Sequence, residues 1–361
     1  MAFTGYAIFP GLRTIGIVAD SVRELAVTFN MDAIEALQKP PEEDLLWADN
    51  IAGVTAAPFE AKIPLDLTAL DGFEPFKGTR TYKQIDITAI EAHVQQWQRN
   101  LEWDIRFTQA GPVLQQVYNT AKYADAMVYQ ARVMKARLAA SVLMLGTPST
   151  NLVQVYAGNN IPGAGKSLFS LTHYSNPLDG GSRPFANYFP ASGLFNGTSY
   201  ATTRANMRQI PSPTQSAETL GLQVTDIIGP SIMEEPFRQL ALSQLILQTG
   251  SGGATGAVGA VSNIYAAGIT PCNFWIAPQL DGDPYLQANP GKHLWFAVSR
   301  KLIGAHPIEM VAPTKEFTPI IQIFGDGSEL AAQTRKVHLM GDLDAGAAAG
   351  LPHTIARYEQ T

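Results

Sequence analysis

The stretch PVLQQVYNTAKYADAMVYQARVMKARLAASVLMLGTP, residues 112–148, decides the fold class. Small and apolar residues recur through it at alternating steps of four and three, the spacing of one helix face. Pro112 is typical of a helix start, and Gly146 with Pro148 is typical of a helix end. The residues on this face are Val117, Ala121, Ala124, Val128, Ala131, Leu138, Val142 and Leu145.

A helix over 112–145 would be about 50 Å long at ~1.5 Å per residue. That is several times the length of an average globular helix, which favours a strut lying along a sheet. A coiled coil is the competing interpretation. Lys135 and the alanine-rich stripe favour packing against a sheet.

The sequence before this helix predicts an arm and a hairpin. Residues 1–53 have one short helical pattern after Asp20-Ser21 and too little apolar surface to fold alone. In 54–87, apolar residues alternate with polar ones from Phe59 to Leu65, a strand pattern, and 79–87 reads as the return strand. An isolated hairpin is marginal in water, so we expect it to need a neighbour. Residues 88–103 are predicted to be helical.

The sequence after the long helix predicts loops, then a second mixed region. Residues 147–197 are rich in Gly, Pro, Asn and Ser, with a strand-like LVQVY at 152–156. Further helices are expected from Thr198 or Ser199 to Gln209 and from Glu234 through Ile246. Strands are expected at 224–229 and, from 271 to 340, in FWIAPQL, HLWFAV, IEMVA, IIQIF and KVHLM.

Composition points to a surface that meets other protein. Charged residues make up 16% of the 361, against roughly 25% in ordinary soluble domains. The net charge is −6 and no polybasic run occurs, which disfavours DNA binding through phosphate neutralisation. The single cysteine, Cys272, excludes an intrachain disulfide. The N-terminal sequence has no signal-peptide pattern, and no apolar run approaches the ~20 residues that span a bilayer.

Motifs that suggest catalysis are incomplete. Gly163-Ala164-Gly165-Lys166-Ser167 imitates the end of a phosphate-binding loop, but Asn160 stands where the first glycine belongs. Gly250, Gly252 and Gly256 have the wrong spacing for a dinucleotide fingerprint. The pairs Glu42-Glu43 and Glu234-Glu235 read as helix-flanking charges, and Cys272 as inert core. The histidines are scattered, at positions 93, 173, 293, 306, 338 and 353. We therefore expect no enzyme, no catalytic residue, no cofactor and no metal.

Several short motifs resemble the major head subunits of Mu-like tailed phages. The segment from Gly165 to Ser170, followed by His173, resembles that family's loop of the form G-K-x-L-F-x-x-x-H. Further resembling segments follow in order; they are Asn187, the helix 200–208, Leu220-Gly221-Leu222-Gln223, the strand and turn 227–233, Trp275 to Leu280, Leu294-Trp295-Phe296 and Pro307-Ile308-Glu309. The similarity covers roughly residues 55–361, and the stretch 184–200 departs from the family pattern.

The resemblance implies an α+β fold of the Hong Kong 97 capsid type. It places an N-terminal arm at 1–53, an extended hairpin loop at 54–87 and a peripheral domain at 88–197 with the spine helix at 112–145. The axial domain would be 198–320, and 321–361 would return to the peripheral domain. Lys62, Lys77 and Lys83 lie in the extended loop, where some relatives form crosslinks.

The function implied is that of a virion capsid protein, assembled in the bacterial cytoplasm. Copies would form hexamers and pentamers of an icosahedral shell around double-stranded DNA, without sequence-specific DNA binding and without a membrane. A portal, and scaffold or decoration proteins, are the expected partners. An encapsulin-like compartment and a soluble nucleotide-binding enzyme remain as alternatives, and a tail or baseplate protein fits the long helix less well.

Overall fold

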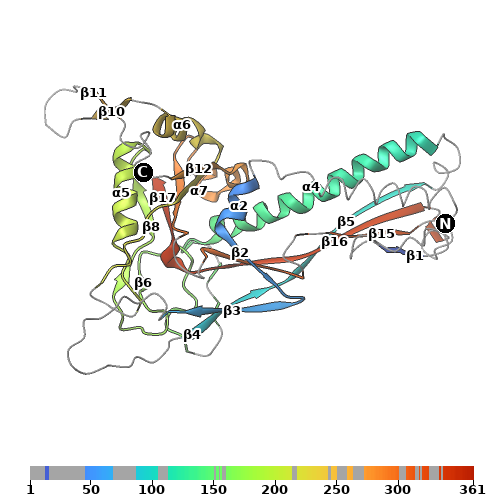
Figure 1. The fold of residues 1–361 in the computed structure, drawn as a ribbon, viewed down its shortest axis with the longest axis horizontal. Helices are drawn as coiled ribbons and strands as arrows, with labels where there is room; N and C mark the ends of the chain where they lie inside the picture. The colour runs from blue at the N-terminus through green and yellow to red at the C-terminus, as the bar shows by residue number, and fades with distance from the viewer. Residues whose placement is uncertain are drawn as a thin grey trace.

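The computed structural model describes most of the chain in separate ranges (Figure 1). These ranges are 13–15, 45–67, 87–104, 113–149, 152–153, 155–156, 160–213, 218–242, 245–249, 258–262, 272–300, 306–313, 317, 319–324, 333–334 and 336–361. Helices and strands are mixed along these ranges, which confirms the predicted α+β class.

A long sheet forms one part of the molecule. Its strands are β1 (Arg13–Ile15), β2 (Ala52–Ala56), β5 (Gln95–Asp104), β14 (Ile308–Ala312), β15 (Ile320–Phe324) and β16 (Lys336–Ala349). Strand β16 runs through the whole sheet: its first part pairs with β15 and β5, and its last part pairs with β14. Side chains alternate across β16, so Leu343 and Ala345 face one side while Asp342 and Asp344 face the other.

Helix α4 (Val113–Leu145) lies along this sheet and confirms the predicted strut (Figure 1). Among the described side chains, its core-facing residues include Ala136, Ala139 and Leu143, which are fully buried. They pack in one cluster with Leu343 and Ala345 of β16. Small side chains let the helix approach the strand closely, which explains why the stripe is rich in alanine.

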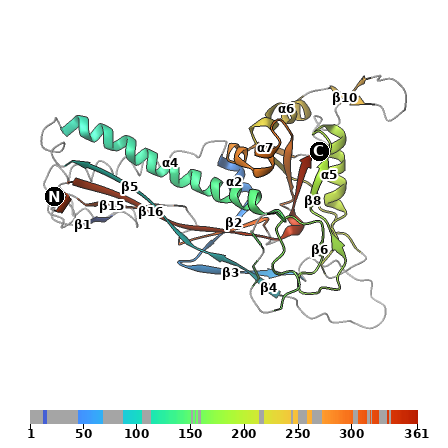
Figure 2. The ribbon, with the colours of Figure 1, turned by 180° about the vertical axis from the view of Figure 1, so that it is seen from behind.

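A second sheet, the end sheet, lies at one end of α4 (Figures 1 and 2). Its strands, in spatial order, are β12 (Asn273–Ile276), β9 (Asp226–Gly229), β13 (Leu294–Val298), β17 (Ile355–Gln360) and β8 (Tyr188–Ser192). Helices α5 (Gly197–Arg208) and α6 (Glu234–Leu242) pack on it around Trp295 and Phe237. The short helical segments around it are η3 (Ser231–Met233), η4 (Pro278–Gly282), α7 (Pro284–Ala288) and η5 (Pro352–Thr354).

The remaining described elements are short. Helix α2 (Leu46–Ile51) packs against α4 through Trp47 and Ile51. Antiparallel strand pairs complete the set: β3 (Glu60–Asp66) with β4 (Ile87–His93), β6 (His173–Tyr174) with β7 (Pro184–Phe185), and β10 (Leu245–Thr249) with β11 (Val258–Ser262).

The helix predicted over 88–103 is wrong. These residues form β4 and β5, and β5 pairs with β16 over ten registered pairs from Lys336↔Asp104 to Ala345↔Gln95. Glu, Gln and Ala favour a helix locally, but the pairing partner lies more than 200 residues away and decides the conformation.

Other predictions differ at element ends. The helix expected through Ile246 ends at Leu242, and Leu245 and Ile246 belong to β10. The strand-like 152–156 shows isolated bridges at Val153 and Tyr156 in its described residues. The arm helix, the hairpin tip and residues 79–86 of the return strand expected at 79–87 lie outside the described residues. Ile87, the last residue of that expected strand, begins β4.

Both sheets take strands from more than one of the ranges expected to form domains. Strand β8 of the end sheet comes from 88–197, and β14 of the long sheet comes from 198–320. Within 321–361, β16 is in the long sheet but β17 pairs with β13 and β8 of the end sheet. Each sheet is therefore assembled from distant parts of the sequence.

Candidate assembly surfaces

The loop that imitates a phosphate site has a structural role. Residues 162–165 form turns, and Ser167 bridges Val153 instead of opening a helix. Lys166 Nζ donates to the carbonyl of Thr172 at 2.9 Å and lies 4.8 Å from the centre of the Tyr174 ring. The lysine is thus engaged within its own loop. Gly250, Gly252 and Gly256 lie outside the described residues, as do Glu42 and Glu43.

Other candidate chemical groups are also accounted for by packing. In the described part of the chain, no group of three or more His, Cys, Asp and Glu side chains could hold a metal. Glu234 pairs with Arg238 across one helical turn at 2.9 Å. Cys272 packs beside the end-sheet core, and burial raises the pKa of its thiol to about 12.

Within the described residues, no helix has the length and apolar character to cross a membrane.

Two of the scattered histidines pack against the same phenylalanine ring. His173 and His353 flank the ring of Phe185, with ring centres 5.3 and 4.5 Å away. Burial lowers the pKa of His173 to about 4 and that of His353 to about 3. Asn187 supports this cluster by donating to the carbonyls of Leu168, Pro352 and Ile355. Both imidazoles are therefore neutral parts of the core, a contact that sequence spacing gave no means to predict.

A buried ion network joins the end sheet to the helix strut. Both Arg357 terminal nitrogens donate to Asp283 at 2.8 Å, and its Nε donates to Glu359 at 2.7 Å. A further bond reaches the carbonyl of Leu143 near the end of α4 at 3.2 Å. Burial works to lower the pKa of Arg357, but the two carboxylates outweigh it and raise that pKa.

A second network connects the end sheet to α2. Asp226 on β9 is fully buried and accepts from Arg300, from Trp275 Nε1 at 2.8 Å and from Thr225 Oγ1 at 2.7 Å. Arg300 also donates to Asn50 Oδ1 of α2 at 2.8 Å. These hydrogen bonds tie the end sheet to α2, which packs against α4.

The hairpin base is packed on the chain's own body. Ala61 and Ala92 contact Val311 of β14, while Leu65 and Ile90 pack with Tyr156 of the following loop. The base of the hairpin therefore has the neighbour that was expected, and that neighbour belongs to the same chain. Residues 68–86 lie outside the described part.

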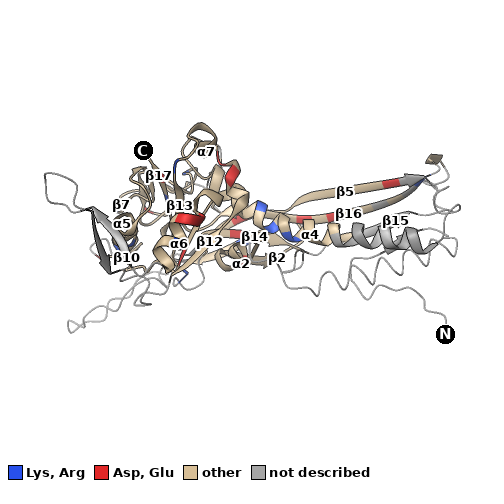
Figure 3. Ribbon diagram, turned by 90° about the horizontal axis from the view of Figure 1, so that it is seen from above, with Lys and Arg blue, Asp and Glu red and all other residues tan. Residues whose placement is uncertain are grey.

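Charged residues are sparse along the described part of the ribbon (Figure 3). Several large apolar side chains are exposed. Phe59, at the turn between β2 and β3, is 81% exposed, and Leu242, at the end of α6, is 75% exposed. Leu171 and Leu194 border a groove beside β8 and α5. Exposed apolar side chains on several separate surfaces are typical of a chain with protein partners.

No family model and no curated protein matches the chain. Among solved structures, it is similar to the capsid of cyanophage Pam1, with 13% identity, a TM-score of 0.47 and coverage of 86% of this chain and 88% of that one. It is also similar to the procapsid of bacteriophage JBD30, with 12% identity, a TM-score of 0.44 and coverage of 96% and 77%. A virus-like particle from Pyrococcus furiosus matches with 11% identity, a TM-score of 0.41 and coverage of 92% and 98%.

With such identities and with TM-scores below 0.5, these likenesses assign no function. The assignment has to come from the architecture of the chain itself.

Proposed function

We propose that the chain is the major capsid subunit of a tailed phage. Copies associate by heterologous contacts into hexamers and pentamers, which close into an icosahedral shell around the genome. The motifs of residues 165–309 that resemble Mu-like head subunits support that subfamily.

The observation that carries the proposal is the projecting strip formed by α4, β5 and β16 (Figure 2). A layer one helix and one sheet thick leaves much of its surface in solvent.

A fixed subunit shape supports the same proposal. A ring closes only if each contact repeats the same rotation, so the angle between the parts of a subunit has to be set within the chain. The networks of Arg357 and Asp226 hold the end sheet against α4 and α2 in this way. The long sheet with α4 would then be the peripheral part, the end sheet the axial part, and 1–53 with 54–87 the arm and extended loop.

The charge balance suits a container for DNA. Acidic residues outnumber basic ones by 31 to 25, so the wall would not trap a packaged duplex. A portal and scaffold or decoration proteins complete the proposed set of partners.

Electron microscopy of the purified chain, with sedimentation velocity on the same sample, tests the proposal. We expect rings and closed shells, and nuclease-protected DNA in particles isolated with the other phage proteins. Shells that contain enzyme cargo and no DNA would favour the encapsulin-like alternative. A monomer at all concentrations would contradict the proposal, and ATP binding to that monomer in calorimetry would favour the enzyme.

A further inference from the structure

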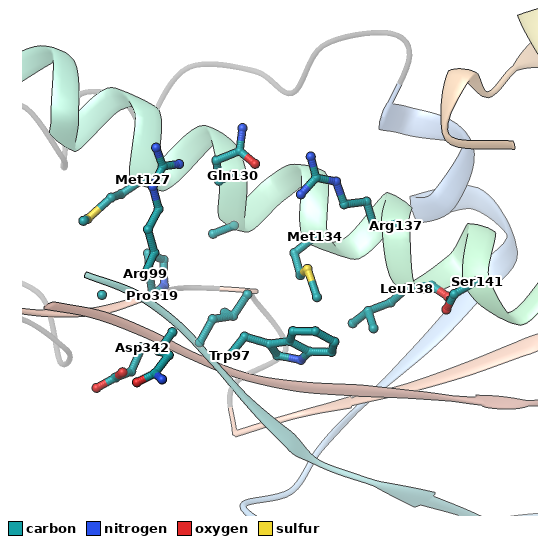
Figure 4. Close-up of a pocket in the computed structure, with 14 residues that line it drawn as sticks. Trp97, Arg99, Met127, Gln130, Met134, Arg137, Leu138, Ser141, Pro319 and Asp342 are labelled. Atoms are coloured by element: carbon teal, nitrogen blue, oxygen red, sulfur yellow. The ribbon is translucent and has the colours of Figure 1, made fainter. Parts of the chain in front are cut away.

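An apolar groove lies between the spine helix and the long sheet (Figure 4). It has a volume of about 530 Å³. Trp97 of β5 lies between the strand and the helix, beneath Met134 and Leu138 (Figure 4). Along α4, Gln130, Met134, Arg137 and Ser141 follow a helical spacing and line the groove with half-buried or exposed side chains. On this face of α4 these side chains are at least partly open to solvent.

The rim of the groove carries uncompensated positive charge. Arg99 reaches from β5 toward α4, and Arg137 lies further along the helix (Figure 4). Both are exposed, and no salt bridge in the described part of the chain includes either of them. Asp342 is the acidic residue of the lining, so the rim carries a net charge of one positive unit. A binding partner that presents an apolar side chain beside a carboxylate would therefore complement the groove and its rim.

The same chain presents such a pair at the corner between β2 and β3. Phe59 is the most exposed large hydrophobic residue described, at 81%. Glu60 follows directly, with 57% of its side chain exposed. Its ion-pair partner is His93 at 3.7 Å, which is charged only when protonated. The corner is therefore an apolar side chain beside an exposed carboxylate.

The corner is held rigidly and away from the groove of its own chain. The Phe59 carbonyl accepts from Val94 N at 2.7 Å, and Ala57 N donates to the Ala312 carbonyl at 2.9 Å. In two opposite views, α4 runs along one face of the long sheet and β3 with β4 lies beyond the other face (Figures 1 and 2). A preorganised corner loses little entropy when it binds, but it has to bind another molecule.

We propose that the groove binds the Phe59-Glu60 corner of a second copy of this chain. The Phe59 ring enters between Trp97 and Met134, and the Glu60 carboxylate pairs with Arg137. Because the corner and the groove are different surfaces, the contact is heterologous and can repeat around a ring. This inference rests on the proposed function and identifies one of its contact surfaces.

Mixed disulfide formation tests the contact in the intact chain. In a Cys272→Ser background, Phe59→Cys protein is mixed with Gln130→Cys protein, assembled and oxidised. We expect a crosslinked dimer containing one of each variant. Leu242→Cys, which replaces another highly exposed apolar residue, is the matched control and should not crosslink to Gln130→Cys.

Charge reversal tests the polar half of the contact. Arg137→Glu and Glu60→Arg should each raise the protein concentration needed for assembly several-fold, and the double variant should return it to within about threefold of wild type. Phe59→Ala should raise it about tenfold or more, as expected for an aromatic anchor, while Leu242→Ala should not. All these positions are exposed, so circular dichroism should show unchanged folding.

The outcomes separate this contact from shell formation itself. The Phe59 contact would be overturned if normal shells form without the mixed crosslink, or if Phe59→Ala assembles as well as wild type. Either result would leave the capsid proposal standing. A crosslink formed within a single Phe59→Cys, Gln130→Cys chain in dilute solution would also overturn it. If wild-type protein forms no shells at all, the proposed function fails first.

Discussion

Glu309 is a carboxylic acid buried between strands, and it makes the stability of the subunit depend on pH. It lies on β14 opposite Gly53 of β2 and is 3% exposed. Burial raises its pKa from 4.5 to about 7, although a hydrogen bond with the backbone of His306 works in the opposite direction. The pKa of Glu309 is higher in the folded state than in the unfolded state. The contribution of this carboxyl to the free energy of unfolding is therefore fully present below about pH 4.5 and is lost as the pH rises through 7.

Replacing this carboxyl by a neutral amide should remove that loss. Above pH 7, we expect Glu309→Gln to be more stable than wild type by on the order of 2 kcal/mol, and the gain should shrink toward pH 5. Urea unfolding at pH 5 and pH 8 measures the difference. A gain of equal size at both pH values would show that titration is not its cause.

Arg357 is the residue on which the junction between the end sheet and α4 depends. Arg357→Met would leave the fully buried Asp283 and the nearly buried Glu359 without their cation. We expect a loss of roughly 3–5 kcal/mol in the free energy of unfolding, as for other broken buried pairs. The matched control is Arg238→Met, which breaks an exposed pair with Glu234 and should cost less than about 1 kcal/mol. Equal losses in denaturant titrations would contradict this role of the network.

At the scale of elements, the junction of β4 and β5 depends on a close approach of two backbones. A Cβ atom placed on Gly346 of β16 would lie 1.8 Å from the carbonyl oxygen of His93. Gly346→Ala should therefore push the hairpin base away from β16 and cost about 2–3 kcal/mol. Gly193→Ala is the control, because a Cβ there meets nothing within 4 Å. Thermal or urea unfolding of both variants measures the difference, and equal stabilities would show that the strands separate freely.

The sequence predicts elements whose stability is local better than pairings between distant segments. Helix α4 was predictable because its stripe continues from Pro112 to Gly146, and α5 because polar residues near Asn196 cap its start. The helix predicted at 88–103 failed because only β16 makes that segment a strand. A weaker signal was present, since Trp97, Leu101 and Trp103 are all at odd positions and the even positions between them are polar, although Arg99 interrupts the alternation.

The candidate surfaces were less predictable still. Trp97 and Met134 are 37 positions apart, and their groove exists only once β5 and α4 are in place. The prediction for 54–87 gave the right kind of element but not the residues against which its base packs. Those residues, Val311 and Tyr156, follow much later in the chain. The sequence also did not predict that Phe59 is exposed, because its alternation with polar neighbours suggested a half-buried strand position.

At the scale of the whole molecule, the hairpin has two parts with different expected roles. Ala61 and Leu65 belong to the subunit's own core, so deleting 60–85 would damage folding and assembly together. A sharper deletion removes 68–86 and joins Leu67 to Ile87 through a short Asn-Gly link, since Asp66 and Ile87 are already paired.

We expect this shortened subunit to unfold at nearly the wild-type urea concentration and yet to form few or no stable shells. The reason is that β3 and β4 keep their contacts, while the tip of the proposed extended loop is gone. A control that replaces 68–86 by a Gly-Ser segment of equal length separates the effect of side chains from that of loop length, and should also fail to assemble. Light scattering and electron microscopy measure the outcome. Normal shells from the shortened chain would show that assembly does not use residues 68–86, and that the contacts have to lie on the strip and the end sheet.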